Sequence, residues 1–383
     1  MNILVCRGVS QNDVLTEMSG SLAQALAECG AGVEWASFAG PQMAEDVAQR
    51  IAATGADWVV SFGSGGADLL TRHGQSIYDA AGCGFVGWDV DHPVYQFKRF
   101  STAIRRRIQI SASPSHARFA RLMGCQATDM AMLPGVNAVS TDRLAIEDRP
   151  ILTTVAMTWL GEPEIWWNDA KGTPAYSLVD GVVGRLLADE RADLFEAYQA
   201  TLADTGLEVR FDEHISNIMA RIGLFVRQYD RLQFAQTLAS LGLPSLICGT
   251  GWKDRLGEQS HITYLDNLNV TDLNEIYGQS RAVFNLNAAN GASERAMMAM
   301  AAGAVVISDY GPLLESEFEA NGGMQFFDRS RPASLAEAVD SALASGGAQT
   351  IADRGHELIS RAGLWSHKAT RLLERLDQVH DRP

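Results

Sequence analysis

Residues 287–309, NAANGASERAMMAMAAGAVVISD, place a turn, a helix and a strand in immediate succession. Gly291 supplies the conformational freedom that a tight turn needs. Ser293 is suited to cap the helix that Glu294 opens, and Gly303 is suited to end it. The apolar run AVVIS that follows is typical of a strand buried on both faces. This order predicts one unit of a parallel α/β sheet.

The same alternation extends over most of the chain. NILVC, DWVVSF and GFVGWD in the first half, and SLICGTGW, ITYLD and AVFNLN in the second, are strand-like runs separated by helical stretches. Such alternation predicts doubly wound sheets, whose ligands gather at the carboxyl ends of the strands. We therefore predict two Rossmann-like domains facing across a cleft. They comprise residues 1–148, residues 149–355 with a helical insertion at about 161–226, and a C-terminal helix over 356–383 that packs back across the domain junction.

Composition and charge exclude several functions. The formal net charge of −15 disfavours nucleic acid and anionic membrane surfaces as partners, because both bind mainly through basic side chains. No apolar run is long enough to span a bilayer. The opening MNILVCRGVS predicts a first strand in place of a secretory leader, and the five cysteines show no CxxC spacing. The sequence thus predicts a cytoplasmic protein with reduced thiols, and no pattern in it predicts an oligomeric state.

The predicted helix start at Glu294 suggests an anion site. Free backbone N–H groups and the positive end of the helix dipole would point toward the carboxyl edge of the sheet. Arg295 adds a planar, permanently charged donor group in the first turn. Most strand–turn–helix units bind nothing, so simple α/β packing and a phosphate site both remain open from the residues alone.

GASERAMMAMAAGAVVISD resembles the nucleotide-sugar segment of group 1 glycosyltransferases of the GT-B fold, and most of all the spore-maturation-protein (CgeB-like) glycosyltransferases. The likeness is good from about Arg231 to the end. FVGWDVDHPVYQ in the first half is similar to them more loosely. Further matches are a Tyr, Ser and Leu-Asn series at Tyr277, Ser280, Leu286 and Asn287, a G.GW segment at Gly249, Gly251 and Trp252, and an aromatic–Ser–His step at Trp365, Ser366 and His367.

The resemblance implies transfer of a sugar from a nucleotide-diphosphate donor to an unidentified glycan, lipid-linked glycan or protein, without a metal or a further cofactor. It implies that Glu294 lies near the sugar or the ribose, and that Arg295 and the helix amides stabilise the departing diphosphate. The implied donor-binding residues are Gly249, Gly251, Trp252, Tyr264, Leu265, Asn287, Gly291, Ser293, Glu294 and Arg295.

One position departs from the pattern. The wider group commonly has a second glutamate five positions before the closing glycine, where this chain has Met298. Either Glu294 takes the ribose, or the donor is held differently, or activity has been lost. Two alternatives accompany the transferase. One is a nucleotide-sugar epimerase of the same fold, which would react without an acceptor. The other, which Met298 motivates, is a non-catalytic carbohydrate- or nucleotide-binding protein derived from a transferase.

The first half supplies candidate catalytic and acceptor-side groups. Asp89 and Asp91 form a D-x-D step beside His92, and these residue types are able to bind Mg²⁺ or Mn²⁺, to act as a general base, or merely to cap a turn. The flanking chain resembles a doubly wound domain, so we predict no metal and retain the three as catalytic candidates with Glu294 and Arg295. The acceptor-side candidates are Ser10, Asp13 and His116.

Overall fold

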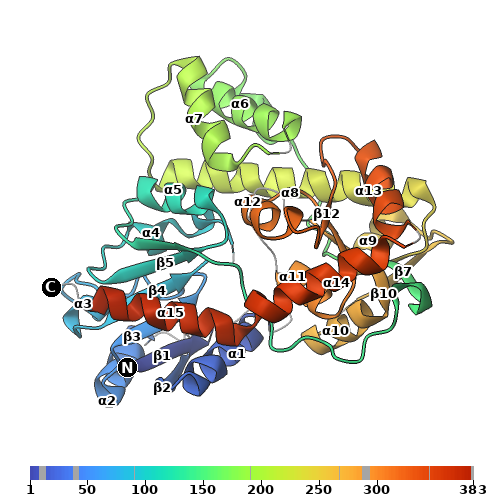
Figure 1. The fold of residues 1–383 in the computed structure, drawn as a ribbon. Coiled ribbons are helices and arrows are strands. Elements are labelled where there is room, and N and C mark those ends of the chain that lie inside the picture. The colour runs from blue at the N-terminus through green and yellow to red at the C-terminus, as the bar shows by residue number, and fades with distance from the viewer. Residues whose placement is uncertain are drawn as a thin grey trace. The chain divides into compact units, whose positions relative to one another are not determined.

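In a computed structural model, the described residues are 1–7, 14–37, 43–89, 91–189, 191–266, 268–286, 294–344 and 346–380. They form two compact units, each with its own parallel six-stranded sheet (Figure 1). This confirms the predicted class of two doubly wound α/β domains. The first unit comprises Met1–Asn137, Phe211–Ser216 and Ala362–Pro383, and the second comprises Ala138–Arg210 and Asn217–Arg361.

The first sheet has the strand order β2-β1-β3-β4-β5-β6. Its central strands are buried along their whole length, because helices cover both faces. The strands are β1 (Asn2–Arg7), β2 (Gly32–Ser37), β3 (Trp58–Phe62), β4 (Gly84–Trp88), β5 (Arg107–Ser111) and β6 (Thr128–Ala131). The helices that follow these strands are α1 (Val14–Glu28), α2 (Met43–Thr54), α3 (Ile77–Ala80), the 3₁₀ turn Pro93–Gln96, α4 (Phe97–Ser101) and α5 (Pro114–Leu122).

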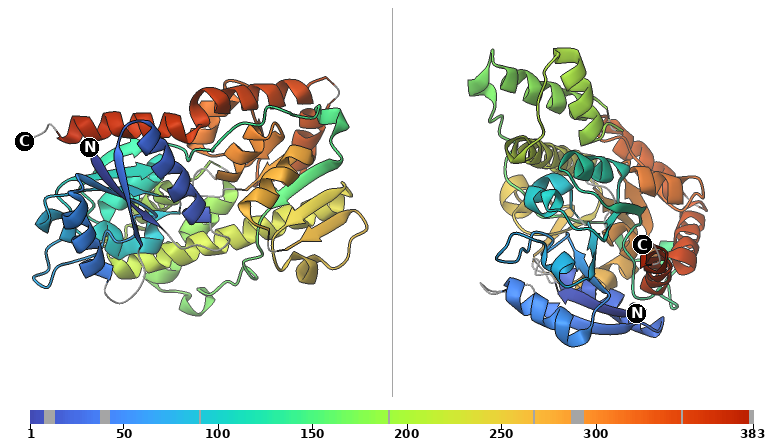
Figure 2. Two further views of the ribbon diagram at one scale, coloured as in Figure 1. Left: turned by 90° about the horizontal axis from the view of Figure 1, so that it is seen from below. Right: turned by 90° about the vertical axis from the view of Figure 1, so that its left-hand side faces the viewer.

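The last helix of the chain, α15 (Trp365–His380), belongs to the first unit. It packs beside α1 on one face of the sheet, while α2 and α3 pack on the other (Figures 1 and 2). The Trp365 ring meets Trp88 edge-on with 5.4 Å between ring centroids. Gly135 permits this approach, since a β-carbon there would lie 2.7 Å from the Trp365 ring. The C-terminal helix thus completes the core of the first unit.

The second sheet has the order β12-β11-β10-β7-β8-β9. The predicted strands AVFNLN and AVVISD are β10 and β11. The strands are β7 (Ile151–Ala156), β8 (Ser245–Cys248), β9 (Ile262–Leu265), β10 (Ser280–Asn285), β11 (Val305–Ser308) and β12 (Gln325–Phe326). The helices are α6 (Pro174–Ala188), α7 (Leu194–Thr205), α8 (Glu213–Leu241), α9 (Trp252–Leu256), α10 (Val270–Gln279), α11 (Glu294–Ala301), α12 (Pro312–Leu314), α13 (Ala333–Leu343) and α14 (Ala348–Leu358).

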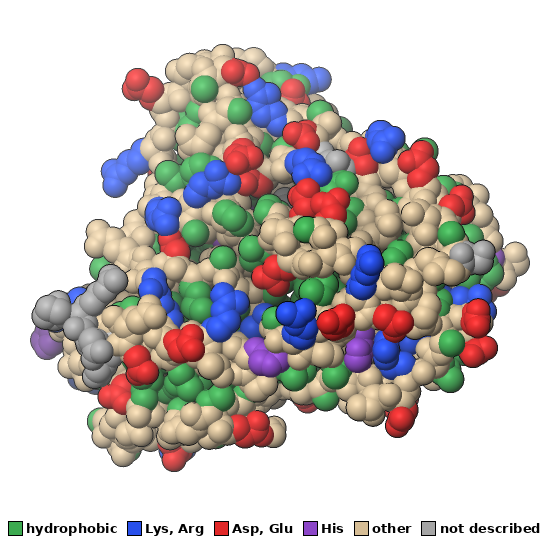
Figure 3. Space-filling model, in the orientation of Figure 1, with side chains coloured by type: hydrophobic (Ala, Val, Ile, Leu, Met, Phe, Trp, Pro, Cys, Tyr) green, Lys and Arg blue, Asp and Glu red, His purple; other side chains and the backbone are tan. Residues whose placement is uncertain are grey.

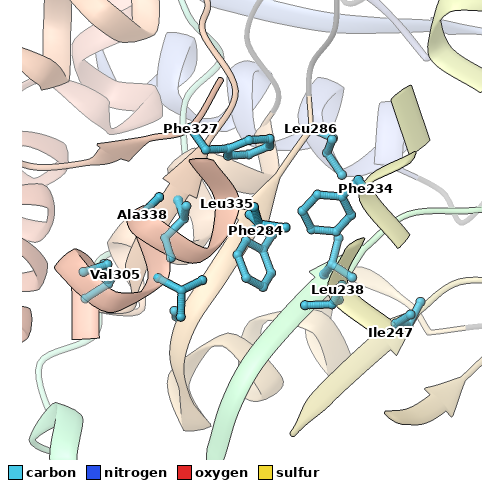
Figure 4. Packing of buried hydrophobic residues seen from close by; sticks show 14 of the residues in the cluster. Phe234, Leu238, Ile247, Phe284, Leu286, Val305, Phe327, Leu335 and Ala338 are labelled. Carbon is cyan, nitrogen blue, oxygen red and sulfur yellow. The ribbon is translucent and has the colours of Figure 1, made fainter. Parts of the chain in front are cut away.

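The core of the second unit lies between its sheet, the second half of α8 and α13 (Figure 4). Phe234 of α8 meets Phe284 of β10 edge-on at 5.2 Å between ring centroids. α10 contacts β7 and β10, α11 contacts β10 and β11, and α14 contacts both α11 and β11. Ala348 and Ala352 of α14 also belong to the core that faces α8 and α13. The helical content expected at 161–226 is present as α6, α7 and the start of α8.

A buried arginine fixes where α11 ends. Arg149, almost fully buried, donates from Nη2 to the carbonyl of Ala302 at 3.1 Å and from Nη1 to that of Ser280 at 2.9 Å. Gly303 follows with φ +75°, the left-handed conformation expected of a closing glycine. The predicted helix end is therefore confirmed, and Arg149 ties it to the start of β10.

The surface carries charges of both signs. On the face drawn in Figure 3, acidic and basic side chains are interspersed and form no extended patch of one sign. Among the described helices, none combines the length and the apolar character that a bilayer crossing requires.

Candidate functional site

The start of α11 lies at the carboxyl edge of the second sheet. Arg295, in its first turn, donates from Nη1 to the carbonyl of Ala156, the last residue of β7. Glu294 opens the helix and is half-buried, as is Met298 one turn later. The turn that precedes them, with the predicted donor residues Asn287, Gly291 and Ser293, lies outside the described residues.

Arg231 of α8 joins this edge and was missed by the sequence reasoning. It is buried and donates from Nη1 to the carbonyl of Thr158 at 2.6 Å. Burial, together with the positive charges of Arg295 and Arg227, lowers the pKa of its guanidinium to about 9. Arg231 and Arg295 therefore both lie at the carboxyl end of β7, and Arg227 lies one turn before Arg231 in α8. An anion placed among them would relieve their repulsion.

The sequence does contain a signal for this cluster. Arg227 and Arg231 are four residues apart and so lie on one side of α8, whose other positions carry the apolar stripe. A charged pair within an otherwise buried helix indicates a polar partner. The sequence does not show which strand α8 packs beside, so it does not show where that partner lies.

The segment 249–252 is fixed to the chain that follows β7. Gly249 has φ +148°, and a β-carbon there would lie 2.1 Å from the carbonyl oxygen of Met157. Trp252 is fully buried, donates from Nε1 to the same carbonyl at 2.8 Å, and meets Trp159 edge-on at 5.0 Å. Gly251 also adopts a positive φ, of +86°. The glycines allow this close approach, and Trp252 supports the loop from within the core.

Tyr264 and Leu265 end β9 at the same edge. The Tyr264 hydroxyl donates to the carbonyl of Gly257 at 3.0 Å, and the Leu265 side chain is exposed. Because the strands are parallel, their carboxyl ends share one edge of the sheet. The structure thus brings Gly249, Gly251, Tyr264, Leu265 and Arg295 to one edge, as the predicted donor site requires.

In the first unit, Asp89 directly follows β4 within a buried polar network. Its carboxylate accepts hydrogen bonds from Ser64 at 3.1 Å and from Ser111 at 3.4 Å. Gln109 donates to Ser64 at 3.0 Å and accepts from Arg107 at 2.8 Å. Burial raises the pKa of Asp89 to about 7, against the opposing effects of Arg107 and the hydrogen bonds. A carboxyl group that titrates near neutrality is suited to proton transfer.

Replacing Asp89 with asparagine is expected to remove a pH dependence of stability. Because the folded-state pKa lies above that of the unfolded chain, this carboxyl stabilises the fold at acid pH. That stability is lost as the pH rises from about 4 through 7, by up to roughly 4 kcal/mol. Denaturant unfolding at a series of pH values, compared between Asp89→Asn and the wild type, measures the difference. Asp91→Asn, at an exposed neighbour, is the control, and parallel curves for Asp89→Asn and the wild type would contradict the assignment.

His92 and His116 form a buried pair. Their rings meet edge-on at 4.7 Å between centroids, and Phe119 packs 5.0 Å from the His92 ring. Nδ1 of His92 accepts from the Val94 amide at 3.3 Å, whereas Nε2 of His92 and both nitrogens of His116 have no hydrogen-bond partner among the described residues. Burial lowers the pKa of both rings, that of His116 to about 3.

The remaining candidates of the first unit are Asp91, Ser10 and Asp13. Asp91 is exposed. Ser10 and Asp13 lie outside the described residues. Across the residues that the structure describes, no three His, Cys, Asp or Glu side chains converge in the manner of a metal site. Those candidates of this unit that the structure describes therefore separate into the buried Asp89 network, the His92–His116 pair and the surface carboxylate of Asp91.

Comparison with known proteins relates this geometry to sugar transfer. A family described as glycosyl transferase-like matches residues 227–374, which contain Arg231, Arg295 and the whole carboxyl edge apart from the end of β7. No curated protein matches the chain by sequence. The match supports the group 1 resemblance at the level of this segment. The CgeB-like subtype stays a prediction.

Solved glycosyltransferase structures share the fold over the full length. A sucrose-phosphate synthase from Thermosynechococcus elongatus is 11% identical with a TM-score of 0.60, and 99% of each chain is covered. HepE from Anabaena, solved in complex with UDP-glucose, is 12% identical with a TM-score of 0.58, and 99% of this chain and 100% of HepE are covered. A glycosyltransferase from Rickettsia africae is 12% identical with a TM-score of 0.55, covering 100% and 99%. At these identities the likeness establishes the fold, which is GT-B.

Proposed function

We propose that this chain is a glycosyltransferase that moves a sugar from a nucleotide-diphosphate donor to a glycan, lipid-linked glycan or protein, with arginines in place of a metal at the diphosphate. The observation that carries the proposal is the convergence of Arg231 and Arg295 at the carboxyl end of β7, beside the first turn of α11. The match of residues 227–374 to glycosyl transferase-like proteins supports it. The UDP-glucose complex of HepE, which has the same fold, is consistent with it.

The chemistry follows from where charge develops. As the bond between the anomeric carbon and the diphosphate oxygen breaks, negative charge accumulates on the departing diphosphate. Two guanidiniums, held by backbone carbonyls before the donor arrives, are preorganised to stabilise that charge. Their partial burial strengthens the interaction relative to water. We propose that Glu294, at the start of α11, accepts a hydrogen bond from a hydroxyl group of the donor.

The acceptor hydroxyl must lose a proton as it attacks the anomeric carbon. In a retaining reaction the departing diphosphate is able to take that proton. In an inverting reaction a protein base is needed, and Asp89, Asp91 and His92 remain the candidates. Asp89, with a pKa of about 7, has the best match to neutral pH. Ser10, Asp13 and His116 remain the candidates for binding the acceptor.

Substituting Arg231 or Arg295 with methionine is expected to weaken diphosphate binding about tenfold to a hundredfold each, since a hydrogen bond to a charged group contributes roughly 1.5–3 kcal/mol. Methionine keeps much of the apolar contact and removes a buried cation, so the fold should persist. Calorimetry with UDP, GDP, TDP and ADP in the presence of EDTA measures the affinities. A nucleotide that binds with EDTA present supports the arginine assignment.

Arg221→Met is the matched control. Arg221 lies on the same helix but stacks on Trp166, with 3.6 Å between its guanidinium carbon and the ring centroid. Its replacement should leave nucleotide affinity unchanged. Unaltered affinity in both site variants, or failure of every nucleotide to bind the wild type, would refute the proposal.

A further inference from the structure

A cavity opens in the second unit between α8, the end of β10 and the chain that follows β12. It includes about 280 Å³ of empty space, part of it open to solvent. One side of the cavity is apolar, and the other is polar. The apolar side is formed by Phe234, Leu286, Phe327, Pro332 and Leu335.

The polar side is built around an ion pair. Nη1 of Arg329 donates to Oδ2 of Asp230 at 2.7 Å, and the two side chains are only 6% and 4% exposed. Nη2 of Arg329 donates to the carbonyl of Leu186 at 2.8 Å. Arg329 is thus engaged on two sides, while Oδ1 of Asp230 has no hydrogen bond from any other described residue and is open to a further donor.

Asp230 would gain from such a donor. Burial, together with the negative charge of Asp309, raises the pKa of its carboxyl to about 6 in spite of the opposing charge of Arg329. The ionised carboxylate is therefore less well stabilised in the folded protein than in water. A neutral N–H group from a ligand would supply the missing hydrogen bond without adding a charge to a buried site.

The position of the cavity relates it to the proposed donor site. Asp230 directly precedes Arg231 in α8, and Phe234 of the apolar wall lies one turn after Arg231. Leu286 directly follows β10, the strand that pairs with β7. The cavity lies at the carboxyl edge of β10, on the face of the sheet that carries α8 and α13. A substrate group that enters the cavity would lie next to the diphosphate. Because the transferred sugar is attached to the diphosphate, that group would be part of the sugar.

We propose that this cavity binds an N-acyl substituent of the donor sugar, with the acyl methyl against the apolar wall and the amide N–H donating to Oδ1 of Asp230. The inference rests on the proposed transferase function and specifies its substrate class as acetamido sugars. A plain hydroxyl at this position would bond to Asp230 but would leave the apolar wall uncovered.

The test uses a base-free pair of ligands, N-acetylglucosamine 1-phosphate and glucose 1-phosphate, which differ at the acetamido group. Ligand-observed NMR titration of the full chain should give about tenfold tighter binding of the acetamido compound. Thr237 lines the cavity, and its hydroxyl donates within α8 to the carbonyl of Gln233 at 2.8 Å. Thr237→Leu should fill the space and abolish the preference.

Gln236→Leu, at the exposed neighbouring position, should retain the preference. Equal affinities in the wild type, or a preference that survives Thr237→Leu, would overturn the inference. Binding of inorganic pyrophosphate distinguishes failure of the cavity assignment from failure of the proposed function. If pyrophosphate binds and neither sugar phosphate does, the cavity assignment fails while the arginine site stands. If pyrophosphate does not bind either, the proposed function fails and the cavity assignment fails with it.

Discussion

Replacing His116 with leucine is expected to stabilise the first unit, most strongly in acid. At neutral pH, two buried ring nitrogens that have no partner among the described residues would be removed, a gain of about 1–3 kcal/mol. In acid, the unfolded chain binds a proton below about pH 6.5, whereas the folded ring does not until about pH 3. The wild type therefore loses stability as the pH falls, by roughly 3 kcal/mol at pH 4 from this group alone.

Guanidinium unfolding at pH 7.5 and pH 4, followed by tryptophan fluorescence, measures this effect. His73→Leu is the control, since His73 is exposed. An equal loss of stability in acid for the wild type and His116→Leu would contradict the burial argument. His92 adds to the loss in the wild type, because its pKa is also lowered by burial and by the positive charge that His116 would carry.

The same variant tests the acceptor assignment of His116. A structural role predicts a more stable protein with unchanged sugar transfer. A stabilised protein that still binds nucleotide but no longer transfers sugar would identify His116 as an acceptor-side group.

Replacing Trp252 with alanine is expected to cost about 3–5 kcal/mol of unfolding free energy, the usual range for a buried tryptophan. The side chain is fully buried, and its indole N–H bonds to Met157. Trp252→Phe should cost less, because most of the ring volume is kept and the hydrogen bond is lost. Chemical denaturation of the three proteins measures the series.

Nucleotide affinity distinguishes a direct contact between Trp252 and the donor from an indirect structural role. The resemblance places this residue in the donor site, while its burial predicts an indirect effect through the loop at Gly249. Trp252→Phe should therefore leave nucleotide affinity within about threefold of the wild type. A large loss of affinity with little loss of stability would show instead that the indole contacts the donor.

Much of the fold was predictable because its signals are local. Buried parallel strands form continuous apolar runs, and the closing glycine of α11 has the backbone conformation that the sequence suggested. The assignment of α15 to the first unit had no comparable local signal. Its apolar stripe shows that the helix packs against something, but only the folded chain shows that Trp365 meets Trp88.

The candidate site was predictable where chemistry and backbone pattern coincide, as at Arg295. Arg231 was missed because its meaning depends on the strand beside which α8 packs. Trp252 was assigned to the donor site, but it is buried. The sequence pattern of a tryptophan after a glycine loop is the same whether the side chain faces a ligand or the core. Met298 is the residue that motivates the non-catalytic binding protein as an alternative. Turnover of the donor without an acceptor would distinguish an epimerase from a transferase.

The return of α15 to the first unit has a consequence for synthesis. The ribosome makes residues 138–361 after most of the first unit and before the helix that completes its core. At about 5–20 residues per second, the apolar surface around Trp88 and Phe62 stays uncovered on the nascent chain for roughly tens of seconds. Exposed apolar surface of this kind promotes aggregation during that interval, and a premature stop before Trp365 would leave the core of the first unit permanently incomplete.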